Sequence, residues 1–280
     1  MSRGVRAGVA LGAIVLLVAA VMSRDSAAPA AEVVAWRELP PPPLSPREFP
    51  TGFWTGSEIV LVGGSHAPPC HPSASCRPPD TPPLADGAAY DPRTGSWRTI
   101  PDAPVGFAWA EKVALGSTAY LWIAGEPWRP EAPRAFLAYR FDGDRWEELP
   151  LPTHEGEEGW YHLANAGDRV VAYSSSDEER ERPDFVFDPA SETWSELPDD
   201  PFSSGFDRVL IWSGQELLLF DHEIVPNPGG DGEPLPLRGA ALDLRTDEWR
   251  ILEDPDAAYE ASVPVWDDSL AGILDDSGAR

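Results

Sequence analysis

One short pattern occurs four times in this chain and constrains its fold more than any other feature. An aromatic or apolar residue comes first, a Trp follows seven residues later, and Ile or Leu stands three residues after that Trp. The copies read GAAYDPRTGSWRTIP, LAYRFDGDRWEELP, FVFDPASETWSELP and AALDLRTDEWRILE, and a shortened copy, VVAWRELP, surrounds Trp36. Successive tryptophans are 61, 49, 48 and 55 residues apart. Self-similarity at such a period indicates an array of equivalent supersecondary units.

Upstream of each copy, two apolar or alternating runs are joined by a short turn that contains Gly. They read FWTGSEIVLVGG, VALGSTAYLWIAG, LANAGDRVVAYSS and LIWSGQELLLFD, and a last copy, PVWDDSLAGILDD, lies near the C-terminus. Runs of four to seven residues with such turns between them predict β-hairpins. In the first unit we expect strands at residues 53–55, 59–62, 88–90 and 97–100. Outside the N-terminal apolar run, no segment shows a helical pattern.

The spacing of Tyr90 and Trp97 has a simple structural reading. Asp91 can hydrogen-bond its own backbone to open a turn, Pro92 presets φ, and Gly95 accepts a positive φ. Tyr90 and Trp97 then flank this turn on neighbouring strands, where they are placed to pack between sheets. Units of about 50 residues with four strands cannot bury both faces alone, so the chain is predicted to be all-β, with the architecture of a β-propeller.

These residues resemble the kelch repeat of the galactose-oxidase-like β-propellers, which has a double glycine after the second strand, then a Tyr, then a Trp after the next turn. The first copy matches completely, the second keeps one glycine, Gly125, and the later copies keep only the aromatic or apolar position and the Trp. The resemblance spans residues 32–275 and is specific for fold rather than for activity. The structural positions that it implies are Trp36, Gly63, Gly64, Tyr90, Trp97, Tyr139, Trp146, Phe187, Trp194 and Trp249.

Members of that family usually have six or seven blades, whereas this chain shows about five units. In the last unit, residues 263–266 and 270–274 form two strands, the third strand is missing, and residues 33–37 around Trp36 return as its outer strand. Closure of this kind removes sheet edges. We expect a small ring of five units with an incomplete last blade; a shortened relative that closes poorly is the alternative.

Residues 1–30 are predicted to be a signal peptide or an N-terminal membrane anchor, and residues 31–280 the kelch-like propeller domain. Arg3 and Arg6 precede an uncharged, mostly apolar run at residues 7–22, and small residues follow at 28–30. The apolar run is marginally short for a membrane span, so cleavage and anchoring both remain open. Either way, the domain is expected outside the cell or at the cell envelope. A single lysine, Lys112, beside many Arg, Ala, Pro and Gly is typical of a G+C-rich bacterial genome.

The net charge of −26 excludes nucleic acid as a partner, because such a chain repels phosphate backbones. Cys70 and Cys76 lie in a Pro-rich loop of an exported chain with two cysteines, and we expect them to form a disulfide worth roughly 2 kcal/mol. A metal site with His66 and His71 is the alternative, although the spacing that structural zinc requires is missing. Membrane contact is expected only through an uncleaved N-terminal segment.

In an up-and-down sheet, the links between strands 1–2 and 3–4 lie on one face, and the links between strands 2–3 and between units lie on the other. The first set are tight turns and the second set are long, so we expect any site on the long-loop face. Apolar, aromatic or histidine side chains there are the candidate ligand contacts, with packing under the loops as the alternative: Trp128, His154, Trp160, Tyr161 and Phe202. The loops are acidic, which leaves Ca²⁺ open, but no known calcium-loop spacing occurs and no cofactor is expected.

No motif for catalysis is present: G-x-S-x-G, a phosphate-binding loop and H-E-x-x-H are all missing. The copper site of galactose oxidases does not carry over, because no matching Tyr–Cys arrangement is recognisable. The leading hypothesis is therefore a binding module at the cell envelope that takes a protein or a glycan. The alternatives are a carbohydrate-active enzyme on a propeller scaffold and a degenerate propeller that serves as a structural spacer.

Overall fold

A computed structural model of the chain describes residues 38–66, 82–125, 133–153, 160–175, 183–202, 205–223 and 237–262. Residue contacts divide the chain into two compact parts, Met1–Leu39 and Pro40–Arg280, and all described strands lie within Pro40–Arg280. The N-terminal apolar run, Trp36, both cysteines and the two expected strands of the fifth unit lie outside the described residues. No helix in the described ranges is long and apolar enough to cross a membrane.

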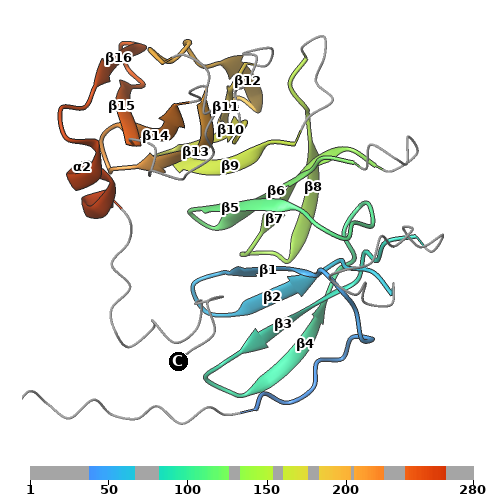
Figure 1. Cartoon of the computed structure of the whole chain (residues 1–280). Coiled ribbons are helices and arrows are strands. Elements are labelled where there is room, and N and C mark those ends of the chain that lie inside the picture. Colours follow the sequence, from blue (N-terminus) through green and yellow to red (C-terminus); the bar gives the residue numbers. More distant parts are fainter. Residues whose placement is uncertain are drawn as a thin grey trace, which may run out of the picture. The chain divides into compact units, whose positions relative to one another are not determined.

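Four antiparallel sheets of four strands each make up the described fold, and in every sheet the strands pair in chain order (Figure 1). The first contains β1 (Thr51–Trp54), β2 (Ile59–Val62), β3 (Gly87–Asp91) and β4 (Ser96–Ile100). The second contains β5 (Glu111–Leu115), β6 (Thr118–Ile123), β7 (Ala135–Arg140) and β8 (Arg145–Leu149). The third contains β9 (His162–Ala166), β10 (Arg169–Tyr173), β11 (Phe185–Asp188) and β12 (Thr193–Glu196). The fourth contains β13 (Gly205–Trp212), β14 (Leu217–Glu223), β15 (Leu237–Asp243) and β16 (Glu248–Ile251).

The expected strands of the first unit agree with β1–β4 to within two residues at every end, and β2 agrees at both ends. The turns between strands share one backbone geometry. Each link between the first and second strands has a glycine with positive φ: Gly56, Gly116, Gly167 and Gly214. Each link between the third and fourth strands has a positive φ two residues before the Trp: Gly95, Asp144, Glu192 and Asp247. The repeat seen in the sequence is therefore a repeat of backbone conformation.

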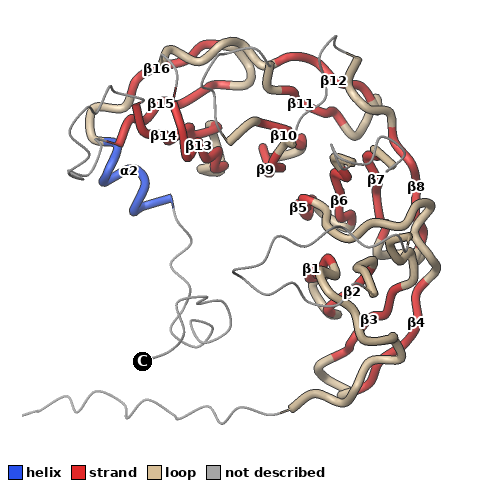
Figure 2. The backbone as a smooth tube through the Cα atoms, turned by 45° about the vertical axis from the view of Figure 1, so that its right-hand side comes forward, coloured by secondary structure: helices blue, strands red, loops and turns tan. Residues whose placement is uncertain are grey.

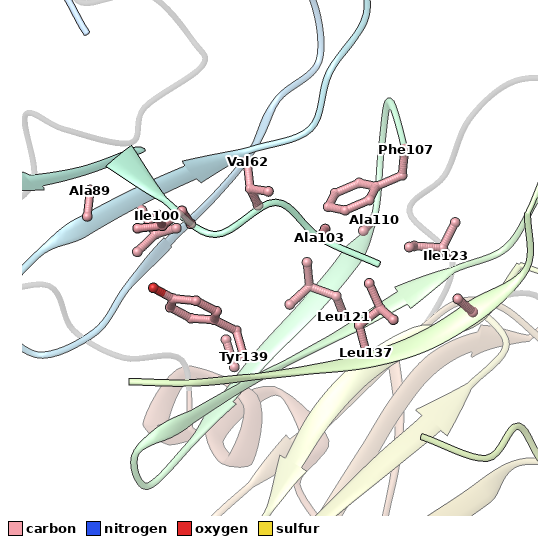
Figure 3. Close-up of a cluster of buried hydrophobic side chains, with 13 residues drawn as sticks. Val62, Ala89, Ile100, Ala103, Phe107, Ala110, Leu121, Ile123, Leu137 and Tyr139 are labelled. Atoms are coloured by element: carbon pink, nitrogen blue, oxygen red, sulfur yellow. The ribbon is translucent and has the colours of Figure 1, made fainter. Parts of the chain in front are cut away.

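The hydrophobic core lies between successive sheets. Figure 3 shows the cluster between the first two sheets, where Val62 and Ile100 of the first face Leu121 and Leu137 of the second. Equivalent clusters lie between the second and third sheets and between the third and fourth. Strands β1, β5, β9 and β13 lie on the same side of their sheets and contact one another in chain order (Figure 2). Among the described strands these contacts do not close into a ring.

The repeated tryptophans join neighbouring units by hydrogen bonds. The indole Nε1 atoms of Trp146, Trp194 and Trp249 donate to a proline carbonyl that follows the outer strand of the preceding unit, and that of Trp97 donates to Pro40 in the segment before β1. The pairs are Trp97–Pro40 at 2.7 Å, Trp146–Pro101 at 2.9 Å, Trp194–Pro150 at 2.7 Å and Trp249–Pro198 at 2.9 Å. Every acceptor stands four residues after the Trp of its own unit. The four-residue spacing from Trp to Pro thus places a hydrogen-bond acceptor for the Trp that follows.

The helix α2 (Pro255–Ser262) corrects the expectation that no helix follows the N-terminal run. Pro255 and Asp256 suit a helix start, where a missing N–H costs nothing and a negative charge is favoured. The helix packs on β15 and contributes Ala258 to a cluster with Phe220 on the outer face of the fourth sheet. At eight residues it is too short to be stable alone, so its docking on this sheet stabilises it.

Candidate functional site

The strand registers show which links share a face. Thr51 pairs with Val62 and Gly87 pairs with Ile100, so the links between units and the links between second and third strands leave the first sheet at one end. Trp54 pairs with Ile59 at the opposite end, where the tight turns lie. The same pairing occurs in the other three sheets. This arrangement confirms the expected long-loop face.

Three exposed aromatic side chains occupy equivalent places on this face, and we call them the aromatic row: Phe49, Trp109 and Trp160. Each stands two residues before the first strand of its unit. Their exposed fractions are 60%, 57% and 40%, which is unusual for such large apolar groups. The rings of Phe49 and Trp109 are stacked with centroids 6.1 Å apart, and Trp160 meets Trp109 edge-on at 5.7 Å. Rings from three successive units therefore form one continuous exposed surface.

Phe49 is held in a strained backbone conformation. Its φ is 53°, in the left-handed region that bulky residues rarely adopt and that costs of order 1 kcal/mol or more. An antiparallel bridge beside it fixes the backbone: the amide of Glu48 donates to the Ser65 carbonyl at 2.8 Å, and the return bond is 2.9 Å. In this conformation the Phe49 ring is exposed to solvent and stacks on Trp109 instead of packing in the core. Strain that serves neither burial nor turn formation is typical of a functional surface.

Glu111 and His162 support the other end of the row. Nδ1 of His162 lies 3.5 Å from the Oε2 atom of Glu111, and Trp160 lies near the same carboxylate. Burial alone would raise the pKa of Glu111, but the hydrogen bonds from His162 and Trp160 and the charge of Lys112 outweigh it and lower that pKa. Glu111 is therefore an ionised group that fixes the edge of the Trp160 ring.

A pocket of about 310 Å³ opens at the row between the first and second units. Its size lies at the lower end of the range for small-molecule sites. Apolar walls and a few polar groups line it: Phe49, Pro50, Thr51, Trp109, Ala110, Glu111 and Lys112. A second pocket of about 370 Å³ lies along the outer strand β12 and the segment 150–153, away from the row. It contains the bond between Trp194 and Pro150, so it belongs to the junction between units.

Two buried arginines stiffen the long-loop face. Arg47 donates to both carboxylate oxygens of Asp86 at 2.8 Å and to the Gly63 carbonyl at 3.0 Å, and its side chain is 5% exposed. Arg208 makes the equivalent contacts with Asp184 and the Ser174 carbonyl. Bidentate pairs of this kind fix geometry as well as charge. The loops that frame the row are thus anchored to the sheets.

The double glycine of the first unit has a steric reason. Gly63 and Gly64 both have positive φ, at 72° and 102°. A Cβ atom on Gly63 would lie 2.5 Å from the carbonyl oxygen of Phe107, and the Gly64 amide donates to that same oxygen at 2.7 Å. The chain before Trp109 therefore packs against the end of β2 only because no side chain intervenes there.

The residues expected to contact a ligand differ in their exposure. Trp160 lies in the aromatic row, but Tyr161 is 1% exposed, donates to the Pro183 carbonyl at 3.2 Å and belongs to the core. Phe202 is partly buried, with the Arg238 guanidinium 4.8 Å from its ring centroid. Tyr161 and Phe202 therefore pack against other side chains, which is the alternative to ligand contact. Trp128 and His154 lie outside the described residues.

Sequence reasoning did not single out Phe49, Trp109, Glu111 or Lys112 as site residues. The available signal is an aromatic residue two positions before the first strand in the first three units, as in FPT, WAE and WYH. Within the described ranges, no group of three His, Cys, Asp or Glu residues is arranged to hold a metal ion. Comparison with family models and with curated proteins finds no match to this chain.

Proposed function

We propose that this protein is an exported, kelch-like β-propeller that binds a glycan through the aromatic row. The observation that carries the proposal is the exposure of Phe49, Trp109 and Trp160 at equivalent positions of three successive units. The N-terminal sequence supports export, and the repeat supports the kelch-like relationship. Neither depends on the aromatic row, so the three parts of the proposal can be tested separately.

A glycan suits this surface better than the other classes of ligand. The face of an aromatic ring carries partial negative charge, and the weakly positive C–H groups of a sugar ring can lie on it. The three rings form a narrow track beside a small pocket, whereas a stable protein interface buries about 800 Å² on each partner. Nucleic-acid bases also stack on aromatic rows, but the net charge of −26 opposes their phosphates.

We further propose that a fifth unit closes the ring. On the first sheet, Phe53 packs toward the second sheet, so its neighbour Trp54 faces the opposite side. Trp54 and Ile59 pair on that side with exposed fractions of 49% and 37%. An apolar sheet face of this kind requires a partner, and in this proposal residues 31–37 and 263–280 supply it.

The tryptophan bonds support the same closure. Pro40, which accepts the bond from Trp97, stands four residues after Trp36, as every other acceptor stands after its own Trp. The Trp36 segment therefore has the spacing of an outer strand that precedes the first unit. On the fourth sheet, α2 packs on the third strand β15, where the missing third strand of a fifth unit would otherwise pack. In this proposal α2 takes the place of that strand.

A glycan array probed with residues 31–280 tests the proposed function, with Trp109→Ala and Trp160→Ala variants beside the wild type. We expect the wild type to bind a restricted set of glycans and each variant to lose at least about tenfold in affinity, which corresponds to roughly 1.4 kcal/mol. The control is Ile251→Ala, because Ile251 is 63% exposed and lies outside the row. Binding that survives both tryptophan substitutions, or binding to peptides alone, would contradict the proposal.

A further inference from the structure

Lys112 is the single lysine among the 21 basic residues of this chain, and it lies at the aromatic row. It is the second residue of β5, its side chain is exposed, and it lines the pocket beside Phe49 and Trp109. No ion pair involves Lys112 in the part of the chain that the structure describes. An ammonium group without an ion pair to any carboxylate of the described ranges therefore lines the pocket.

No ion pair joins Lys112 to the neighbouring carboxylate of Glu111, although the Lys112 charge contributes to the lowered pKa of that carboxyl. Successive residues of a strand point to opposite sides, so Glu111 shares its side of β5 with Val113 and Leu115. Those two residues pack toward the third sheet, where Glu111 meets Trp160 and His162. Lys112 points to the other side. The two charges thus serve different places: Glu111 supports a ring of the row, and Lys112 is available to a ligand.

We propose that the glycan bound at the aromatic row is an acidic one, and that Lys112 binds its carboxylate. This inference rests on the proposed function and specifies the ligand class. A uronic acid residue has the two features that the pocket complements: a ring with C–H groups for the Phe49 and Trp109 faces, and a carboxylate on the ring edge for an ammonium group. A charge-assisted hydrogen bond between them would be among the stronger contacts of such a site.

The choice of lysine is consistent with this role. A guanidinium group in this position would stack on the exposed aromatic faces and cover the surface that a sugar ring needs. A lysine carries a compact charge on a flexible stem and leaves those faces open. A single uronic acid carboxylate at Lys112 meets mainly the charges beside it, because charges more than about 8 Å away are largely screened at physiological ionic strength. A nucleic acid differs in presenting a phosphate at every nucleotide, so that it meets the net charge of −26 along its whole length.

The test compares uronic acid oligomers, such as those of polygalacturonate and alginate, with the same oligomers after reduction of their carboxyl groups. Titration calorimetry of residues 31–280 should give at least about tenfold tighter binding of one unreduced oligomer, and added salt should weaken that preference. Lys112→Gln should lose the preference and bind the unreduced and the reduced form with the same affinity. Lys112→Arg should weaken both forms. Thermal unfolding of each variant checks that it is folded.

The outcomes separate the two proposals. Equal binding of the two forms by the wild type, with loss of both in Trp109→Ala, would overturn the acidic ligand and leave the glycan-binding function standing. A preference for the unreduced form that persists in Lys112→Gln would overturn the role of Lys112. Failure of the wild type to bind any acidic or neutral oligomer, on the array or in solution, would overturn the proposed function itself.

Discussion

At the residue scale, two equivalent tyrosines differ in one bond. The Tyr139 hydroxyl donates to Asp144, whose carboxylate also accepts two bonds from Arg98 of the first unit. The Tyr90 hydroxyl is buried and has no partner among the described residues. The residue that corresponds to Asp144 is Gly95, which has the same positive φ but no side chain. One unit thus contains a hydrogen bond that its neighbour lacks.

Gly95→Asp should therefore stabilise the protein. The carboxylate would reach the Tyr90 hydroxyl as Asp144 reaches that of Tyr139, and Asp tolerates a positive φ better than most residues. We expect the free energy of unfolding in urea to rise by about 0.5–1 kcal/mol. Gly95→Ala is the control: it has the backbone cost without the bond and should lower stability. An Asp variant no more stable than the Ala variant would refute this account of Tyr90.

At the element scale, the bonds from Trp146, Trp194 and Trp249 to proline carbonyls connect the second, third and fourth sheets each to the one before it. Trp146→Phe keeps an aromatic ring against Tyr139 but removes the donor to Pro101, so an acceptor loses its partner. We expect a loss of about 1–2 kcal/mol in the free energy of unfolding. Trp109→Phe, at an exposed position of the row, should change stability by less than about 0.5 kcal/mol. Equal losses in both variants would mean that the bond does not hold the units together.

The strands could be predicted from the sequence because turn residues and the Tyr–Trp spacing are local signals. Turns at Gly56 and Gly95 bound the strands closely, and strand alternation then decides which side of a sheet each residue covers. Helix α2 could not be predicted in this way, since it depends on docking against Phe220 rather than on its own pattern. The long-loop face could be predicted from topology alone.

The identity of the site residues on that face could be predicted only in part. The sequence indicates Trp160, in the link between the second and third units, but not Phe49, which follows a Pro-rich segment, or Trp109, in the link between the first and second units. The strained φ of Phe49 and the stacking of its ring on Trp109 depend on the bridge between Glu48 and Ser65, which joins segments that no local pattern relates. Trp160 is exposed and the adjacent Tyr161 is buried, a difference that no local sequence pattern indicates.

At the scale of the whole molecule, the proposal of a closed ring makes Trp36 a core residue. Trp36→Ala should then lower the free energy of unfolding by about 3 kcal/mol or more, as for other large core aromatics. The same substitution in a segment that does not dock should cost less than about 0.5 kcal/mol. Unfolding of residues 31–280 in urea distinguishes these values. A loss of less than about 0.5 kcal/mol in the free energy of unfolding would contradict the fifth unit and would not affect the four described sheets.

The central claim is that a ligand lies across the aromatic row on one face of the molecule, and fluorine NMR of protein labelled with 5-fluorotryptophan tests it most directly. Resonances are assigned with single Trp→Phe variants and followed while a glycan identified on the array is added. We expect the resonances of Trp109 and Trp160 to shift together and to saturate at the same ligand concentration. The resonances of the four tryptophans that bond to prolines should not shift: Trp97, Trp146, Trp194 and Trp249. Shifts confined to those four junction tryptophans, with Trp109 and Trp160 unchanged at saturation, would contradict it.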